Sequence, residues 1–131
     1  MIVIDASAVI ELLLRTTRGK KVEARVLKPE EQLHAPHLID IEIAQALRRL
    51  VQLKELTAAR GKQALEDHQS LHIKRASHHD MLPRIWQLRD SITAYDSAYV
   101  TLAEALDVPL VTCDAKLARS HGHTAKIELV E

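Results

Sequence analysis

The chain has 131 residues, enough for one domain over residues 1–131, and 47% of them are apolar, so a core can form from Ala, Leu, Ile and Val. Eighteen Lys and Arg residues balance eighteen Asp and Glu residues, which argues against a broad basic surface for duplex DNA or for membranes. With no Phe, one Trp and two Tyr, the chain is poorly equipped to bind nucleic acid by base stacking.

Predicted strands and helices alternate along the chain. Short β-branched or alternating runs predict five strands, at residues 2–4, 33–35, 71–75, 108–112 and 126–130. Apolar residues at helical spacing, together with capping residues, predict helices at residues 7–14, 20–27, 38–53, 57–70, 79–90, 93–106 and 115–119. This order implies an α/β domain with a mainly parallel five-stranded sheet and helices on both faces.

Several local expectations accompany this prediction. Ser7 is expected to cap the first helix, and residues 16–19 are expected to separate that helix from the second. Trp86 is expected to belong to the core, and the alternative is that it forms part of a surface for a second copy of the chain or another protein. Asp40 is expected to be a first-turn acid favoured by the helix dipole.

Cellular location is inferred from two absences. Cys113 is the only cysteine, so no disulfide can form within the chain. The sequence begins with a short apolar run and shows neither a signal peptide nor a membrane span. A cytoplasmic protein without a membrane partner is therefore expected.

Four acidic residues stand where predicted segments change: Asp5, Glu42, Asp96 and Asp114. Each alone has an ordinary explanation as a helix cap or a solvated helix residue. Together they are expected at one edge of the sheet, beyond the carboxyl ends of the parallel strands. Carboxylates gathered there would repel one another unless they shared a cation. Oxygen ligands suit Mg²⁺ or Mn²⁺, whereas the cysteine and histidines offer no zinc-binding spacing.

Four segments carry a family resemblance, namely VIDASA at 3–8, PHLIDIEIA at 36–44, TAYDSAY at 93–99 and LVTCD at 110–114. In order and spacing, over nearly the whole chain, they resemble the PIN-domain ribonucleases, and more narrowly the VapC toxins of toxin–antitoxin pairs. The resemblance implies a PIN-like α/β/α fold and Mg²⁺- or Mn²⁺-dependent endoribonuclease activity that leaves a 5′-phosphate and a 3′-hydroxyl. It also implies a small VapB-like antitoxin and a homodimer as partners, besides the RNA substrate.

The resemblance places the family's acidic quartet, as metal ligands and catalytic residues, on Asp5, Glu42, Asp96 and Asp114. It places two supporting hydroxyls on Ser7 and Thr112. The three aspartates are expected to bind the ion directly or through water. For Glu42 two roles stay open, because it could bind the ion or act as the base that holds the attacking water.

Two arginines are candidates for substrate binding. Arg49 lies two helical turns after Glu42 and either holds an RNA phosphate or lies on a solvated face. Arg15 belongs to a basic cluster that either contacts RNA or forms a solvated loop.

Two other functions compete with the nuclease. A receiver-like signalling domain also gathers acids around Mg²⁺, but it would have a second acid beside Asp5, where this chain has Ala6. A non-catalytic PIN-like module that binds RNA or protein would have lost some of the acids, and all four are present here.

Overall fold

The computed structural model describes residues 1–131, and its centre is one five-stranded sheet with the order β3-β2-β1-β4-β5. The strands are β1 (Ile2–Ile4), β2 (Leu33–Pro36), β3 (Ile73–Ala76), β4 (Leu110–Thr112) and β5 (Ile127–Leu129). All four neighbouring pairs are parallel, which confirms the predicted sheet. The order differs from the 2-1-3-4-5 order of receiver-type domains, and this argues against the signalling alternative.

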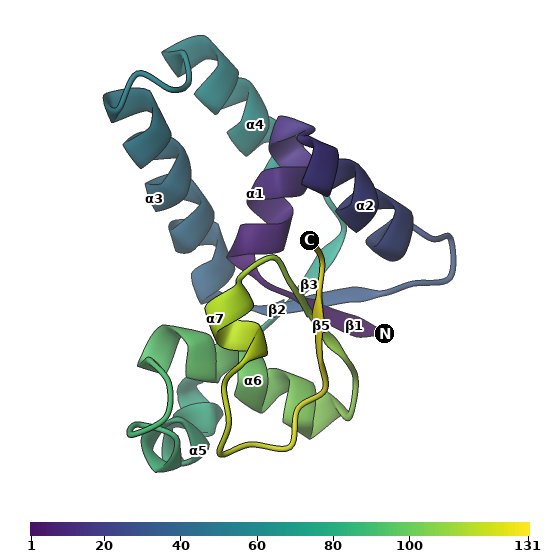
Figure 1. The fold of residues 1–131 in the computed structure, drawn as a ribbon, viewed down its shortest axis with the longest axis vertical. Helices are drawn as coiled ribbons and strands as arrows, with labels where there is room; N and C mark the ends of the chain where they lie inside the picture. Colours follow the sequence, from purple (N-terminus) through teal and green to yellow (C-terminus); the bar gives the residue numbers. More distant parts are fainter.

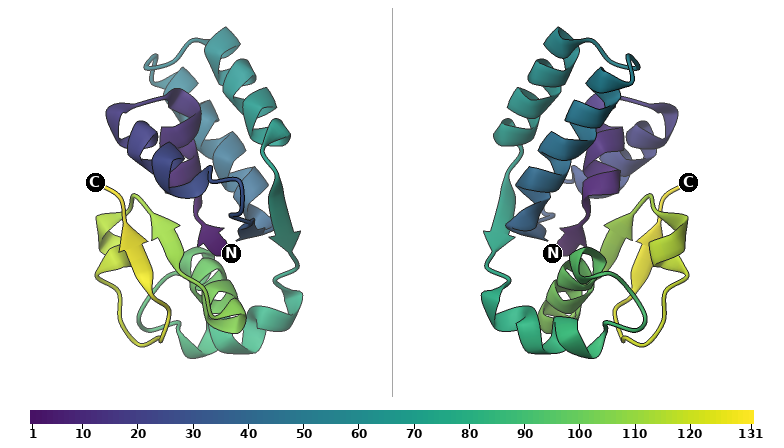
Figure 2. Two further views of the ribbon diagram at one scale, coloured as in Figure 1. Left: turned by 90° about the vertical axis from the view of Figure 1, so that its right-hand side faces the viewer. Right: turned by 90° about the vertical axis from the view of Figure 1, so that its left-hand side faces the viewer.

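Helices cover both faces of the sheet. They are α1 (Ala6–Leu14), α2 (Thr17–Val26), α3 (Leu38–Gln52), α4 (Ala58–Ser70), α5 (Leu82–Gln87), α6 (Ala94–Leu106) and α7 (Ala115–Ala118), with a 3₁₀ turn, η1, at His79–Met81. Helices α1 to α4 gather on one side of the sheet and α5 and α6 on the other, while α3 and α4 form a pair that projects beyond it (Figures 1 and 2). No helix combines the length and the apolar run that crossing a bilayer requires.

The core lies on both faces of the two central strands. Ile2, Val3 and Ile4 of β1 are at most 1% exposed, and Leu110 and Val111 of β4 are fully covered. Continuous apolar runs of this kind are typical of parallel strands that are buried on both faces. Since Ile4 pairs with Val111, the residues that follow β1 and β4 emerge side by side at one edge of the sheet.

The starts of the first two helices differ from prediction. Asp5, not Ser7, caps α1, because its carboxylate accepts the N–H of Ala8. Helix α2 begins at Thr17, three residues earlier than predicted, because Thr16 caps it by accepting the N–H of Gly19. Gly19 therefore does not interrupt a helix but allows α2 to approach α1 closely, since a Cβ there would lie 1.9 Å from the backbone oxygen of Glu11.

The prediction that Trp86 belongs to the core was wrong. The helix predicted over residues 79–90 is split into η1 and the short α5, and Trp86 is 68% exposed. Leu88, two residues further on, occupies the covered side instead at 2% exposure. The guanidinium of Arg89 lies over the Trp86 ring, 4.8 Å from its centroid.

Candidate active site

Asp5 follows β1 and is the most covered of the four acids, at 5% exposure. Its Oδ1 accepts the Ser7 hydroxyl at 2.7 Å and the Ala8 N–H at 3.0 Å, and its Oδ2 accepts the Thr112 hydroxyl. Burial raises the pKa of Asp5 to about 6, these hydrogen bonds oppose the rise, and the negative charge of Asp96 adds to it. Asp5 is thus held in one orientation in surroundings that disfavour its charge.

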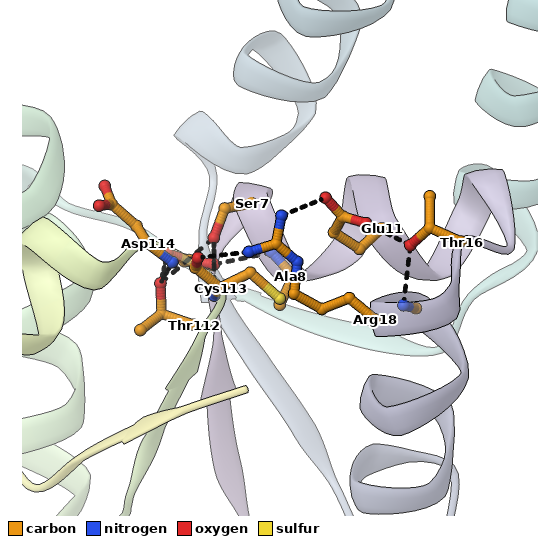
Figure 3. A network of polar contacts seen from close by, with 10 residues as sticks. Ser7, Ala8, Glu11, Thr16, Arg18, Thr112, Cys113 and Asp114 are labelled. Carbon is orange, nitrogen blue, oxygen red and sulfur yellow. Dashed lines mark hydrogen bonds and ion pairs between the residues drawn. The ribbon is translucent and has the colours of Figure 1, made fainter. Parts of the chain in front are cut away.

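The hydroxyls of Ser7 and Thr112 join the ends of the two central strands. Thr112 accepts the N–H of Asp114 at 2.9 Å, and Ser7 accepts the N–H of Cys113 at 3.0 Å. The two hydroxyl oxygens are 3.2 Å apart. The carboxylate of Asp114 points away from this network in Figure 3, and its Oδ1 caps α7 by accepting the N–H of Lys116 at 2.8 Å.

Asp96 stands in the first turn of α6, where its N–H donates to the capping hydroxyl of Thr93 at 3.2 Å. Burial raises the pKa of Asp96, and the negative charge of Asp114 raises it further, against the effect of Lys116. The charge of Asp96 in turn raises the pKa values of Asp5 and Glu42. Asp96 is therefore the one acid that is electrostatically coupled to the other three.

Glu42 lies on α3, where burial raises its pKa. Its Oε1 accepts a hydrogen bond from the hydroxyl of Tyr99, a buried residue of α6, and this bond opposes the rise. The hydrogen bond between Tyr99 and Glu42 was not predicted from the sequence. The signal was present, since Tyr99 follows Asp96 by three residues and shares its helix face.

The donor chemistry of the four acids fits a hard divalent cation. The side-chain atoms with which they could bind a metal are all oxygens, the ligand atoms that Mg²⁺ and Mn²⁺ prefer. No three His, Cys, Asp or Glu side chains lie close enough to hold one ion together as they stand, so at most two of the four acids could bond directly to the same ion without rearrangement. Mg²⁺ keeps several of its waters and bonds to only one or two carboxylates, so this wider spacing suits it.

The two predicted arginines lie in different places. Arg49 lines a groove of about 1140 Å³ along α3 that Glu42 also lines. Arg15 ends α1 in the left-handed conformation, with φ 54°, and lines a separate pocket that contains none of the four acids. The structure thus places Arg49 in the same groove as Glu42, and Arg15 in a pocket apart from all four acids.

Arg18, three residues after Arg15, does reach the backbone beside Asp114. Its guanidinium donates to Glu11 Oε1 at 3.0 Å and to the backbone oxygen of Cys113 at 3.4 Å, next to Asp114 (Figure 3). Thr16 donates to the other oxygen of Glu11 and so fixes the carboxylate that holds Arg18. The sequence contained no periodic signal for this contact, because it bridges residues 95 positions apart.

Comparison with known proteins gives three findings. Residues 2–121 match the PIN domain family. Ribonuclease VapC12 of Mycobacterium tuberculosis is 44% identical over 130 residues, 99% of each chain, and Ribonuclease VapC9 of the same organism is 46% identical over 118 residues, 90% of this chain and 89% of the relative. A chain of the crystal structure of VapBC2 from Rickettsia felis, bound to a DNA fragment from their promoter, superposes with a TM-score of 0.70 at 13% identity, covering 100% of both chains.

Proposed function

The chain belongs to the PIN domain family, among relatives named VapC ribonucleases, and on this basis we propose that it is a divalent-metal-dependent endoribonuclease, the toxin of a VapBC-type pair. One observation supports the metal dependence most. Four carboxylates from four separate segments are coupled through Asp96, and independent helix caps would not need to converge in this way.

In this proposal Asp5, Asp96 and Asp114 hold Mg²⁺ or Mn²⁺, directly or through water. The bound ion supplies Lewis-acid stabilisation of the charge that develops on the phosphate and makes a water easier to deprotonate. Ser7 and Thr112 keep both oxygens of Asp5 in place, so that its orientation does not depend on the substrate.

Glu42 is the candidate base. Tyr99 occupies its Oε1, which leaves Oε2 free to accept a proton from the attacking water. A pKa raised by burial makes a carboxylate a stronger base, and Glu42 has this shift. As the family resemblance implies, hydrolysis would leave a 5′-phosphate and a 3′-hydroxyl.

Two partners belong to this proposal, and the VapBC2 complex supports the first of them. A VapB-like antitoxin would block the acids, and a second copy of the chain would complete a homodimer. The groove lined by Glu42 and Arg49 also carries the exposed apolar residues Ile41 and Leu53, as a protein-binding surface would.

The decisive experiment uses total cellular RNA, incubated with the purified protein in Mg²⁺ or in EDTA, with the cut sites mapped. We expect discrete cuts that need the metal, carry 5′-phosphates and disappear in Asp5→Asn. Cleavage that persists in EDTA would refute metal dependence. Binding of RNA without cleavage by the parent would favour the non-catalytic PIN-like module.

A further inference from the structure

A second, smaller cleft adjoins the acids on the side of Asp96. It has a volume of about 480 Å³ and lies between the turn that joins α5 to α6 and the segment formed by α7 and the residues after it. Asp96 lines this cleft, whereas the other three acids do not. A ligand in the cleft would therefore reach the acidic site from one defined side.

Three positive side chains line this cleft. Arg89 comes from the α5–α6 turn, and Lys116 and Arg119 come from α7 and its end. Two acids, Asp90 and Asp96, also line it, but the charge of Asp96 would be taken up by the proposed metal ion. With the ion bound, the cleft is a basic site on a chain whose net charge is zero.

Two of these cations have no partner within the chain. The Lys116 ammonium and the Arg119 guanidinium make neither an ion pair nor a hydrogen bond, although seven ion pairs neutralise other charges. The charge of Lys116 is nevertheless felt at Asp96, whose pKa it lowers. Unpaired cations beside an acidic metal site are available to bind an anion.

The walls of the cleft are fixed. Leu88 and Leu117, at 2% and 1% exposure, anchor the two segments in the core. At the far end Gly122, with φ +89°, approaches Ser91 so closely that a Cβ would lie 2.7 Å from its hydroxyl oxygen. Ser120 ties its turn down by donating to the backbone oxygen of Leu117 at 2.6 Å.

We propose that this cleft binds the phosphate backbone of the RNA strand next to the bond that is cut, with Lys116 and Arg119 as the phosphate-binding residues. The inference rests on the proposed nuclease function and names the side from which the strand reaches the metal site. Phosphate contacts position a strand without reading its sequence, so the cleft would serve any target RNA.

The test measures binding of a labelled single-stranded RNA of mixed sequence at several salt concentrations. The Lys116→Gln/Arg119→Gln variant is compared with Lys28→Gln/Lys62→Gln, which removes two cations that also lack side-chain partners and lie away from this cleft. All proteins carry Asp5→Asn, so that bound RNA stays intact. We expect the cleft variant to raise the Kd at least about tenfold and to lower the slope of log K against log salt by about 1.4, that is about 0.7 for each lost phosphate contact.

Further measurements separate this proposal from the nuclease proposal. Without Asp5→Asn, the cleft variant should cleave with a KM that rises by a larger factor than kcat falls, and Arg119→Gln alone, which leaves Lys116 beside Asp96, should show half of the change in salt slope. Equal Kd values and slopes in the cleft and control variants would overturn the cleft. The proposal would also be overturned if the cleft variant lost binding to an oligoglutamate peptide but kept its binding to RNA. That result would mark the cleft as a site for an acidic protein segment. Slopes that differ as expected, in a parent that never cleaves RNA, would uphold the cleft and refute the nuclease.

Discussion

The hydroxyl of Tyr99 donates to Oε1 of Glu42 at 2.5 Å and so joins the middle of α6 to α3, 57 positions apart in the chain. Burial and the neighbouring carboxylates raise the pKa of Tyr99 far above its usual value, so the hydroxyl remains a donor at any working pH. The two helices that carry Asp96 and Glu42 are thereby linked at the site itself.

The Tyr99→Phe substitution removes only this hydroxyl. A hydrogen bond to a charged group contributes about 1.5–3 kcal/mol, so kcat for RNA cleavage should fall about tenfold or more. Because the bond lowers the pKa of Glu42, its loss should move the acid limb of the pH–rate profile to higher pH. Tyr95→Phe is the matched control, since Tyr95 is 66% exposed and its hydroxyl has no partner. An unmoved limb and an unchanged rate in Tyr99→Phe would contradict the role given to Glu42.

Thr112 offers a second test, in which a buried hydroxyl is replaced by a methyl group. Thr112→Val removes the donor to Asp5 Oδ2 and the acceptor for the Asp114 N–H, so unfolding free energy should fall by about 1–3 kcal/mol. Affinity for Mn²⁺ should fall as well, because Asp5 loses its fixed orientation. Thr101→Val is the control, since the hydroxyl of Thr101 is buried without a partner and its removal should cost little. Similar losses in both variants would argue against a special role for Thr112.

Acid should weaken the fold through Glu104. Arg84 and Thr124 hold the pKa of this carboxylate at about 2, below its usual 4.5. A depressed pKa stabilises the fold above the unfolded-state value, so this contribution is complete above pH 4.5 and is lost as the pH falls toward 2. Its size is about 2–3 kcal/mol after allowance for the partly exposed Arg84. Urea unfolding of Glu104→Gln should show lower stability at pH 7 and a smaller loss between pH 5 and 3; an equal pH dependence would contradict the assignment.

The contact between α1 and α2 is tested by Gly19→Ala. The new Cβ would overlap the backbone oxygen of Glu11, so the helices must separate, at a cost of about 3 kcal/mol or more. Gly61→Ala is the control in α4. There the added Cβ meets side chains alone, those of Val51 at 3.0 Å and Leu56 at 3.7 Å, and the gain of about 1 kcal/mol in helix propensity offsets the crowding. Urea melts that give both variants the same stability would refute the close approach at Gly19.

The sheet and the order of elements could be predicted from the sequence because those signals are local. Each strand is a short apolar run, and Asp5 and Asp114 follow such runs directly, so parallel pairing places them at one edge. The caps at Thr57 and Thr93 are equally local, since each depends on residues three positions apart. The role of the four acids as metal ligands stays a prediction.

Contacts between distant segments could not be predicted. Asp40 was expected only to be a first-turn acid that the helix dipole favours, and it does lie in the first turn of α3. It also accepts two hydrogen bonds from Arg75 of β3, and a ring nitrogen of the buried His68 of α4 lies within hydrogen-bond distance of its Oδ1. The hydrogen bonds from Arg75 and His68 hold the pKa of Asp40 at about 2. Together with Asp40, these partners come from three elements, and no periodic pattern encodes their meeting. The prediction for Trp86 was wrong because it relied on a local property, the hydrophobicity of the side chain. Leu88 fills the core position instead.

Titration of Mn²⁺ into the protein and into Asp96→Asn, followed by calorimetry and by thermal unfolding, tests the shared cation most directly. If one ion neutralises the coupled acids, Asp96→Asn should bind Mn²⁺ at least about tenfold more weakly, yet unfold at a higher temperature without metal because the repulsion is relieved. A variant that binds Mn²⁺ as tightly as the parent, and is no more stable without it, would show that these carboxylates do not share an ion.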